Sequence, residues 1–341
     1  MKWWIAALLT GAGLAVGGAI RRRNQSGQFH DRVIVITGGS RGLGLALARE
    51  FGRRGARLAL IARDPDELRR ARNDLQGRGI RVSTWTCDLR TAEPIRQTIA
   101  AIAAQERKID GVVNNAGTML VAPLDLMDDA DFSAAMDLHF WAPYHLVKAA
   151  LPHLRRSGLA RVVNIASIGG RVAVPHMAPY AASKFALVGF SDALRSELAA
   201  ENIRVITVSP GLMRTGSHIN ACFKGDIAKE FAWFATSAAL PLGSVSAERA
   251  ARRIVSAAHA GRPELTVGCA AKSLRIFQAM FPRSMARAIA AINRFLPGVP
   301  PFASRDAQSG SASRSGRLPA WLTWLADRAI PRFNEQPQTP G

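Results

Sequence analysis

The sequence predicts an α/β protein built on a doubly wound parallel sheet. Short apolar runs rich in Val, Ile and Leu alternate along the chain with longer stretches of helical pattern, which favours parallel strands covered by helices on both faces. A glycine-rich turn also follows the first run and opens a helical stretch. The seven strand-like runs lie at 33–37, 57–62, 82–86, 110–114, 161–166, 203–208 and 265–268.

The first strand leads into a loop suited to phosphate. Residues 32–37 read RVIVIT and are followed by TGGSRGLG at 37–44, then by the helical stretch LALAREFGRRG. Strand, glycine loop and helix together are the context in which such a loop binds a dinucleotide, because the helix N-terminus offers free N–H groups and a positive dipole end. An ordinary glycine turn between a strand and a helix is the alternative interpretation.

A second pattern carries acid–base chemistry. Tyr180 and Lys184 are four residues apart and share one face of a helix, and Ser167 precedes the tyrosine by thirteen residues. A phenol normally keeps its proton up to pH ~10, and a neighbouring ammonium group favours the phenolate and lowers that pKa. A serine hydroxyl beside the tyrosine can hold a carbonyl oxygen. The pattern therefore predicts proton transfer to and from a carbonyl or alcohol oxygen, with a cofactor supplying the hydride.

Four motifs stand in the order and approximate spacing of one enzyme family. They are TGGSRGLG at 37–44, NNAG at 114–117, the Ser167, Tyr180 and Lys184 pattern, and the pair Pro210–Gly211. Over residues 31–268 the sequence resembles the short-chain dehydrogenase/reductase family. The resemblance implies a Rossmann fold with strand order 3-2-1-4-5-6-7, and a cofactor bound at the carboxyl ends of the strands where that order reverses.

The end of the second strand indicates which dinucleotide such a fold would bind. A carboxylate there would bind the ribose 2′-hydroxyl and repel a 2′-phosphate, but Ala62 stands at this place and Arg63 follows it. Arg41 lies in the glycine loop, and two guanidinium groups suit a 2′-phosphate. We therefore expect NADP(H) rather than NAD(H), with two ordinary surface arginines as the alternative. Asp64 is expected to face solvent or to begin the next helix.

The resemblance implies further cofactor contacts. Asp88 matches a position that contacts adenine, and residues 115–117 match the turn that flanks the adenosine ribose. Thr215 matches a hydroxyl that binds the nicotinamide carboxamide. The expected cofactor-binding residues are Gly38, Ser40, Arg41, Gly42, Leu43, Gly44, Arg63, Asp88, Leu89, Asn115, Ala116, Gly117, Tyr180, Lys184, Pro210, Gly211 and Thr215.

One position departs from the family pattern. Many members carry an asparagine in the helix before Ser167, where His139 stands here, and there the backbone carbonyl holds a water that links the lysine to solvent. Pro143 lies four residues later and has no N–H, so the His139 carbonyl loses its helical hydrogen bond and the helix should kink. His139 is therefore a candidate catalytic residue through its carbonyl. Its imidazole either takes part or simply packs in the core.

These residues together predict an NADP(H)-dependent oxidoreductase. By the family mechanism, Lys184 binds the nicotinamide ribose and lowers the pKa of Tyr180, Ser167 and Tyr180 hold the carbonyl oxygen, and Tyr180 delivers the proton. A nucleotide-binding or membrane scaffold without turnover is the alternative.

The substrate is indicated only by the loop at 212–240. Its aromatic side chains predict an apolar lid over a lipophilic ketone or aldehyde, unless they are ordinary packing residues. They are Phe223, Phe231, Trp233 and Phe234.

The N-terminal 23 residues predict a membrane anchor. Residues 3–20 contain no charge and residues 21–23 are three arginines; at 1.5 Å per residue the apolar helix is ~27 Å long, close to the thickness of a hydrocarbon core. Positively charged residues next to a membrane helix tend to stay on the cytoplasmic side, so the catalytic domain is expected in the cytoplasm. Lys2, at the other end of the helix, opposes this weakly. A signal peptide is disfavoured by arginines in place of a cleavage site. A buried apolar helix remains the other alternative.

Residues 269–341 are predicted to form an amphipathic, helical C-terminal extension. Residues 273–297 combine apolar side chains with arginines and no acid, and 317–333 add two tryptophans. Such segments lie in a membrane interface, although they could instead cover the substrate cleft or a subunit interface. Residues 303–316, rich in Ser, Gly, Ala and Arg, are predicted to be a flexible linker.

Composition narrows the remaining choices. The net charge of +20 suits an anionic membrane surface, and no recognition motif accompanies it, so a nucleic acid is not expected as partner. The three cysteines have no metal or disulfide spacing, which agrees with a reducing compartment and gives no reason to expect a metal site. Membrane lipid and a lipophilic carbonyl or alcohol substrate are the expected partners, and a homo-oligomer is compatible with the sequence.

Overall fold

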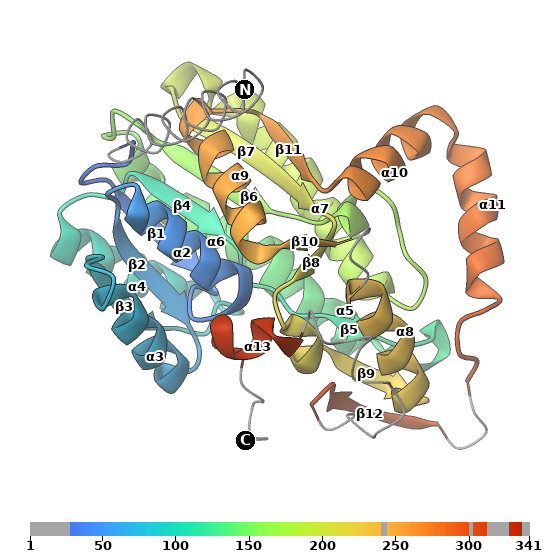
Figure 1. The fold of residues 1–341 in the computed structure, drawn as a ribbon. Coiled ribbons are helices and arrows are strands. Elements are labelled where there is room, and N and C mark those ends of the chain that lie inside the picture. The colour runs from blue at the N-terminus through green and yellow to red at the C-terminus, as the bar shows by residue number, and fades with distance from the viewer. Residues whose placement is uncertain (1–27, 240–243, 300–302, 312–326, 336–341) are drawn as a thin grey trace, which may run out of the picture.

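A seven-stranded parallel sheet forms the centre of the protein. The computed structural model describes residues 28–239, 244–299, 303–311 and 327–335 (Figure 1). The strand order is β3-β2-β1-β4-β6-β7-β11, which is 3-2-1-4-5-6-7 when these strands are counted alone, so the predicted order is confirmed. Their bounds are β1 Val33–Thr37, β2 Arg57–Ala62, β3 Val82–Thr86, β4 Gly111–Asn114, β6 Arg161–Ile165, β7 Arg204–Pro210 and β11 Glu264–Val267.

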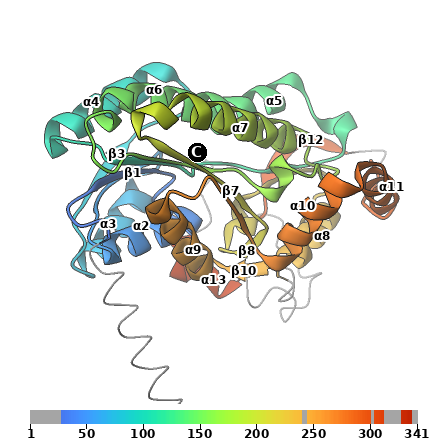
Figure 2. The same ribbon diagram turned by 90° about the horizontal axis from the view of Figure 1, so that it is seen from above.

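Helices cover both faces of this sheet, as Figure 2 shows. One layer packs on the core cluster that contains Ile34, Ile36 and Leu60, and the other on the cluster that contains Val35, Ala59 and Ile61. The first layer comprises α2 Gly42–Arg53, α3 Pro65–Gln76 and α9 Ala247–Ala260; the second comprises α4 Ala92–Glu106, α5 Asp129–Met136, α6 Ala142–Leu154 and α7 Ala178–Glu197.

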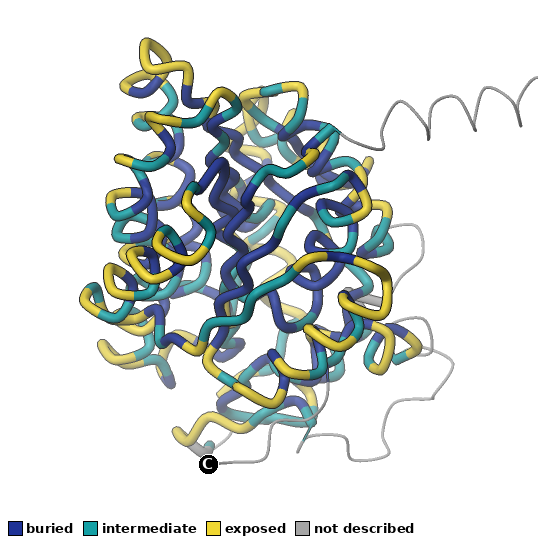
Figure 3. Tube along the Cα trace, turned by 90° about the vertical axis from the view of Figure 1, so that its left-hand side faces the viewer, coloured by how far each residue is buried: buried dark blue, intermediate teal, exposed yellow. Residues whose placement is uncertain are grey.

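Local sequence explains these elements. All five residues of β1, VIVIT, are buried, as a β-branched strand between two helical layers requires. The central strands are accordingly dark blue in Figure 3. Asp64 is the N-cap of α3, where its side chain accepts hydrogen bonds from the backbone N–H groups of Asp66 and Glu67, and Pro65 follows at the first helical position. Asp64 therefore begins the helix, one of the two roles expected for it.

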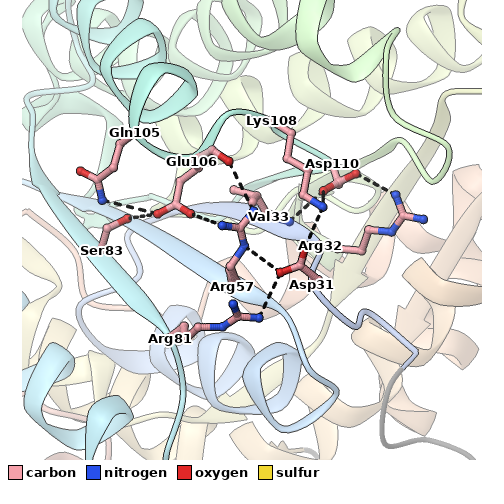
Figure 4. A network of polar contacts seen from close by, with 10 residues as sticks. All are labelled: Asp31, Arg32, Val33, Arg57, Arg81, Ser83, Gln105, Glu106, Lys108 and Asp110. Carbon is pink, nitrogen blue, oxygen red and sulfur yellow. Dashed lines mark hydrogen bonds and ion pairs between the residues drawn. The ribbon is translucent and has the colours of Figure 1, made fainter.

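The amino ends of the strands are joined by a polar network (Figure 4). Asp110, 1% exposed, accepts hydrogen bonds from the backbone N–H of Val33 at 2.9 Å and from Arg32 Nη1 at 3.0 Å. Asp31 pairs with Arg57 and also with Lys108. Exposed ion pairs contribute little stability individually, but the buried Asp110 carboxylate fixes the starts of β1 and β4 against each other. The opposite, carboxyl edge is left for the functional loops.

Two small sheets lie outside the central one in the part of the chain that the structure describes. β8 Leu212–Arg214 pairs with β10 Ser244–Ser246. β5 Leu120–Val121, β9 Cys222–Gly225 and β12 Ser304–Ser309 form a three-stranded sheet in the order β12-β9-β5. The prediction of a flexible linker at 303–316 is therefore wrong for residues 304–309, because β9 offers an edge whose backbone groups pair with this polar segment.

The C-terminal extension contains three described helices. α10 Cys269–Met280 and α11 Pro282–Asn293 project from the body of the protein, and α13 Ala329–Arg332 returns to it (Figure 1). α8 Ile227–Ala239 precedes them in the chain. Single helical turns complete the described structure at Leu124–Leu126, Asp137–Trp141, Ile168–Gly170, Ala199–Glu201 and Ser217–Asn220.

The predicted N-terminal anchor, residues 1–23, lies outside the described residues. Within the described ranges, no helix combines the length and the apolar composition needed to cross a membrane. Of the predicted membrane-interface segment 317–333, residues 317–326 also lie outside them. The prediction is wrong for Ala329 and Phe333, which are buried in the main core cluster.

Candidate active site

Ser167, Tyr180 and Lys184 converge at the carboxyl edge of the sheet. Ser167 ends the loop after β6 and caps a single helical turn, where its Oγ accepts the N–H of Gly169 at 3.0 Å. Tyr180 and Lys184 lie in the first two turns of α7. A Cβ on Gly169 would stand 3.1 Å from Tyr180 Cε1 and 3.4 Å from Ser167 Oγ. Glycine therefore leaves room for the two hydroxyl side chains to meet, and the predicted triad is assembled.

Lys184 is buried beside the tyrosine. Its side-chain Nζ donates a hydrogen bond to the carbonyl of Ile165 at 3.0 Å and lies 5.8 Å from the centre of the Tyr180 ring. Burial lowers the pKa of Lys184 to about 7, because the charged ammonium loses its hydration. Near neutral pH this lysine therefore exists in both charged and neutral forms.

The phenol of Tyr180 holds its proton more firmly than expected. Burial raises the pKa of Tyr180, and a hydrogen bond with Ser167 opposes this only in part. The expectation that Lys184 lowers this pKa is wrong for this structure, because desolvation dominates and also weakens the charge of the lysine itself. A protonated phenol can donate to a carbonyl oxygen, whereas oxidation of an alcohol needs the phenolate.

His139 is buried in a π-helical turn, Asp137–Trp141, directly before α6. Its Nε2 accepts the backbone N–H of Thr118 at 3.1 Å, so the ring proton lies on Nδ1, which is 2.8 Å from Ser183 Oγ. Ser183 Oγ in turn donates to the carbonyl of Tyr180 at 3.0 Å. The imidazole thus links the loop after β4 to the turn of α7 that carries the tyrosine.

The surroundings of His139 keep the ring neutral. Burial, reinforced by the charge of Lys184, holds the pKa of His139 well below its usual range. The ring stands edge-on to Tyr180, with centroids 5.5 Å apart. The predicted helix irregularity is confirmed as a π turn beside Pro143, which lacks an N–H. Whether the His139 carbonyl holds water stays a prediction. Ser183 was missed by the sequence analysis, although its spacing of three from Tyr180 indicates a shared helix face.

The glycine loop has a shape that only glycine permits. Gly38 has φ +60°, and a Cβ on Gly44 would lie 1.9 Å from the carbonyl oxygen of Gly38, so the start of α2 is in backbone contact with the loop. Asn115 Nδ2 donates to the carbonyl of Thr37 at 3.0 Å, and Thr37 Oγ1 accepts the N–H groups of Asn115 and Ala116. These bonds fix the ends of β1 and β4 side by side.

The open side of this loop presents a backbone N–H group that donates to an oxygen atom. The N–H of Gly42 donates to the carbonyl of Phe333 at 2.9 Å, and the carboxylate of Glu335 lies 2.6 Å from where a Gly42 Cβ would be. An acidic group thus stands at the N-terminus of α2. The N–H groups at the start of α2 fit the phosphates of a dinucleotide, which would be held by Ser40, Gly42 and Leu43.

The arginine expected at the 2′-phosphate is already paired. Arg41 Nη1 donates to Glu67 Oε1 at 3.0 Å, and Ser40 Oγ donates to Glu67 Oε2 at 2.8 Å. Glu67, on α3, was not anticipated because nothing in the local sequence places it opposite the loop. Arg63 is exposed. The role of both arginines in binding a 2′-phosphate stays a prediction.

The remaining expected cofactor residues line the same edge. Asp88 pairs with Arg90 at 2.5 Å, and that pairing lowers the pKa of Asp88. Thr215 Oγ1 donates to Ser217 Oγ at 2.8 Å. A Cβ on Gly117 would stand 3.1 Å from His139 Nε2, while Gly211 donates to the carbonyl of Val267. Leu43 and Leu89 are buried, and Pro210 ends β7.

The four predicted lid aromatics pack together beside the tyrosine. Phe223, Phe231 and Phe234 are buried in one apolar cluster, and Trp233 and Tyr180 pack against it. The indole N–H of Trp233 donates to Glu230 at 2.7 Å, and Glu230 also contacts His176. The phenol is thus bordered by apolar side chains on the side of α8 and β9.

Comparison with known proteins agrees with this geometry. The family model described as short chain dehydrogenase matches residues 32–221. The chain belongs to the short-chain dehydrogenase family. It is an oxidoreductase of the short-chain dehydrogenase/reductase type, as the assembled triad also indicates.

Three relatives illustrate the range of this family. The chain is 33% identical over 273 residues to a Mycobacterium tuberculosis protein named "Putative oxidoreductase SadH", covering 79% of this chain and 98% of that protein. It resembles the L-sorbose reductase of Gluconobacter frateurii, solved with NADPH and L-sorbose, at 28% identity and a TM-score of 0.64, over 70% of this chain and 95% of that one. An actinorhodin polyketide ketoreductase solved with NADPH gives 30% identity and a TM-score of 0.62, over 71% and 97%.

The neutral state of His139 can be measured directly. In ¹⁵N-labelled protein we expect the ring to keep its proton on Nδ1 alone at about pH 6.5, where an ordinary histidine is half protonated. Loss of the signal in His139→Asn assigns it, and free imidazole in the same sample provides the reference titration. A His139 ring that becomes doubly protonated above pH 6 contradicts the assignment.

Proposed function

We propose that this enzyme uses NADP(H) to reduce a lipophilic ketone or aldehyde at the cytoplasmic face of a membrane. The observation that carries the proposal is the position of the Ser167, Tyr180 and Lys184 triad next to the aromatic cluster of α8 and β9. Since the pKa of Tyr180 is raised, the phenol carries at neutral pH the proton that it donates in reduction.

The residues of this chain have distinct tasks in the reaction. When bound, the cofactor supplies the hydride for reduction or accepts it in oxidation. Ser167 and Tyr180 hold the carbonyl oxygen, and Tyr180 places its proton on that oxygen as the carbonyl carbon is reduced. Lys184, charged in part, compensates the phenolate that remains until it regains a proton from solvent. The apolar cluster beside Tyr180 excludes water from the reacting atoms.

The preference for NADP(H) rests on charge. Arg63 follows β2 at the place where a carboxylate would exclude a 2′-phosphate, and Arg41 lies in the loop. Two neighbours in the family were solved with NADPH. Arg41 already donates a hydrogen bond to Glu67. Arg63 is therefore the more available of the two guanidinium groups for a 2′-phosphate at the end of β2.

A lipophilic substrate is supported by the apolar surfaces around the triad. A groove of about 750 Å³ runs between α11 and the segment that leads into α7. Its walls include Val174, Ala178 and Phe185 on one side and Ile289 and Ala290 on the other. Ala178 and Phe185 belong to α7, the helix that also carries Tyr180 and Lys184, although the triad residues themselves do not line the groove. Since the sorbose reductase shares this fold, the apolar lining rather than the fold argues for the substrate class.

Membrane attachment is supported by both ends of the chain. The uncharged run 3–20 and the arginines at 21–23 have the pattern of a cytoplasmic-side anchor. Exposed apolar side chains lie along α10 and α11, a region without acidic residues. They include Ile276, Met280, Phe281, Ile292 and Phe295.

Replacing Tyr180 by Phe tests catalysis. The variant removes the proton donor and keeps the ring. General acid catalysis contributes about 10²–10⁴-fold to rate, so we expect NADPH-dependent turnover to fall about 1000-fold or more. NADPH affinity should change little. A panel of lipophilic ketones and aldehydes with protein in vesicles provides the assay. Near-normal turnover by the variant would refute the assignment, and NADPH binding without turnover by the native chain would favour the scaffold alternative.

Replacing Arg63 by Ala tests cofactor choice. Because a hydrogen bond to a charged group contributes about 1.5–3 kcal/mol, NADPH affinity should fall about tenfold or more while NADH affinity is retained. Arg69→Ala is the matched control, since Arg69 lies exposed on α3 and pairs with Asp66. An NADPH preference that survives both Arg63→Ala and the double variant with Arg41→Ala would rule out this explanation.

Removing residues 1–23 tests the anchor. The full chain should stay with the membrane fraction after an alkaline carbonate wash, and the shortened chain should be extracted. Protease added to the cytoplasmic side should digest the catalytic domain. Recovery of the full chain in the extract, or protection of the domain from that protease, would contradict the proposed topology.

A further inference from the structure

The C-terminal segment 329–335 returns to the loop expected to bind the dinucleotide. Its backbone and side chains make specific bonds there, although the two segments are almost 300 residues apart: Phe333 O accepts the N–H of Gly42 at 2.9 Å, and Asn334 Nδ2 donates to the carbonyl of Ser40 at 2.9 Å. Asn334 also donates to the carbonyl of Glu67 and accepts from Arg70 Nε at 2.7 Å. In Figure 1 α13 lies directly beneath the start of α2.

Glu335 places a carboxylate against the open face of the loop. It is 2% exposed, and its Oε2 accepts Asn220 Nδ2 at 2.5 Å and lies 3.7 Å from Arg41 Nε. Its Oε1 lies 2.6 Å from the position of a Gly42 Cβ. Burial raises the pKa of Glu335 to about 7, against the attraction of Arg41 and Asn220. The acid is therefore held by the docking of the whole segment rather than by charge alone.

The other end of the segment covers the second cofactor loop. The Cα of Ile330 lies 3.0 Å from where a Cβ on Gly216 would stand. Gly216 follows Thr215, the hydroxyl expected at the nicotinamide carboxamide. The seven residues thus extend from the glycine loop to the loop after β7. These are the two walls between which a dinucleotide lies in this fold.

The segment and a dinucleotide phosphate both need the N–H of Gly42 and the space in front of it. The first N–H groups of α2 attract phosphate through hydrogen bonds and the helix dipole, yet the N–H of Gly42 is bonded to Phe333 and its open face is covered by Glu335. The carbonyl of Ser40 accepts Asn334 Nδ2, which ties the segment to the loop without using a phosphate donor. A phosphate cannot approach Gly42 closely while these oxygens remain there.

We propose that residues 329–335 act as an internal ligand of the dinucleotide site, so that the C-terminal segment and the cofactor bind in competition. This inference rests on the dinucleotide binding contained in the proposed function, not on turnover or on the substrate. Cofactor affinity is then reduced by the fraction of molecules in which the segment is docked. Weakening the segment should tighten cofactor binding.

Asn334→Ala is the most direct variant. It removes the three side-chain hydrogen bonds of Asn334. It also places alanine, which adopts positive φ less readily than asparagine, at a φ of +57°. Phe333 is unchanged and stays in the core. Asn202→Ala is the matched control, because Asn202 has the same φ of +57° and lies exposed, before β7. NADPH dissociation constants, measured by fluorescence titration of the full chain, should fall at least about fivefold for Asn334→Ala and stay unchanged for Asn202→Ala.

A peptide provides an independent measurement. A chain that ends at residue 326 should bind NADPH at least as tightly as Asn334→Ala. A synthetic peptide with the sequence of residues 327–341 should raise its apparent NADPH dissociation constant in proportion to peptide concentration, and the same peptide with Asn334→Ala should act more weakly. Because Phe333 is part of the core, melting temperatures establish that each variant is folded. If the shortened chain does not fold, the point variant decides.

The outcomes separate the two proposals. Equal or weaker NADPH binding by folded Asn334→Ala overturns the competition and assigns the segment a permanent structural role. Absence of NADPH binding in the native chain and in both variants overturns dinucleotide binding itself. Tighter binding in the variant, without any change in the substrate panel, supports the competition even if the substrate class is wrong.

Discussion

A parallel sheet buried on both faces can present polar chemistry only where its strands end. The five residues of β1 are buried, as are most residues of β2, β4, β6 and β7, so their side chains are committed to packing. The amino edge is occupied by Asp110 and its ion pairs. The residues assigned to binding and catalysis accordingly gather at the carboxyl edge: the glycine loop after β1, the NNAG turn after β4, Ser167 after β6 and Thr215 after β7.

Local patterns predicted most of this edge correctly. The seven strands and the triad could be predicted because apolar strand runs, a glycine loop and a spacing of four on a helix are patterns of residues close together in the sequence. Long-range pairing was not visible. A polar segment at 304–309 becomes a strand because β9 lies beside it, and Glu67 meets Ser40 and Arg41 only once α3 has folded back. The contact between Phe333 and Gly42 likewise depends on the whole fold.

Burial, not the nearest charge, sets the protonation of the triad. Sequence spacing alone suggests that Lys184 should act on Tyr180 as a full positive charge. The structure buries Lys184 and partly buries Tyr180, so desolvation raises the pKa of the phenol and lowers the pKa of the lysine to about 7. Both groups are thereby moved toward their neutral forms. His139 is kept neutral by the same effect, and a neutral imidazole can still orient Ser183 and the backbone of Thr118.

The π turn at Asp137–Trp141 also determines how two helices are phased. A π turn contains one residue more than the α-helix it interrupts, and one residue corresponds to a rotation of about 100° around the helix axis. α5 before the turn packs against α7, whereas α6 after it packs against α4. Deleting a single residue within 137–141 would restore an unbroken helix but rotate one of these faces out of contact. His139 lies in the turn that sets the rotation of α6 relative to α5. An insertion or deletion in this turn would change that rotation more than a substitution would.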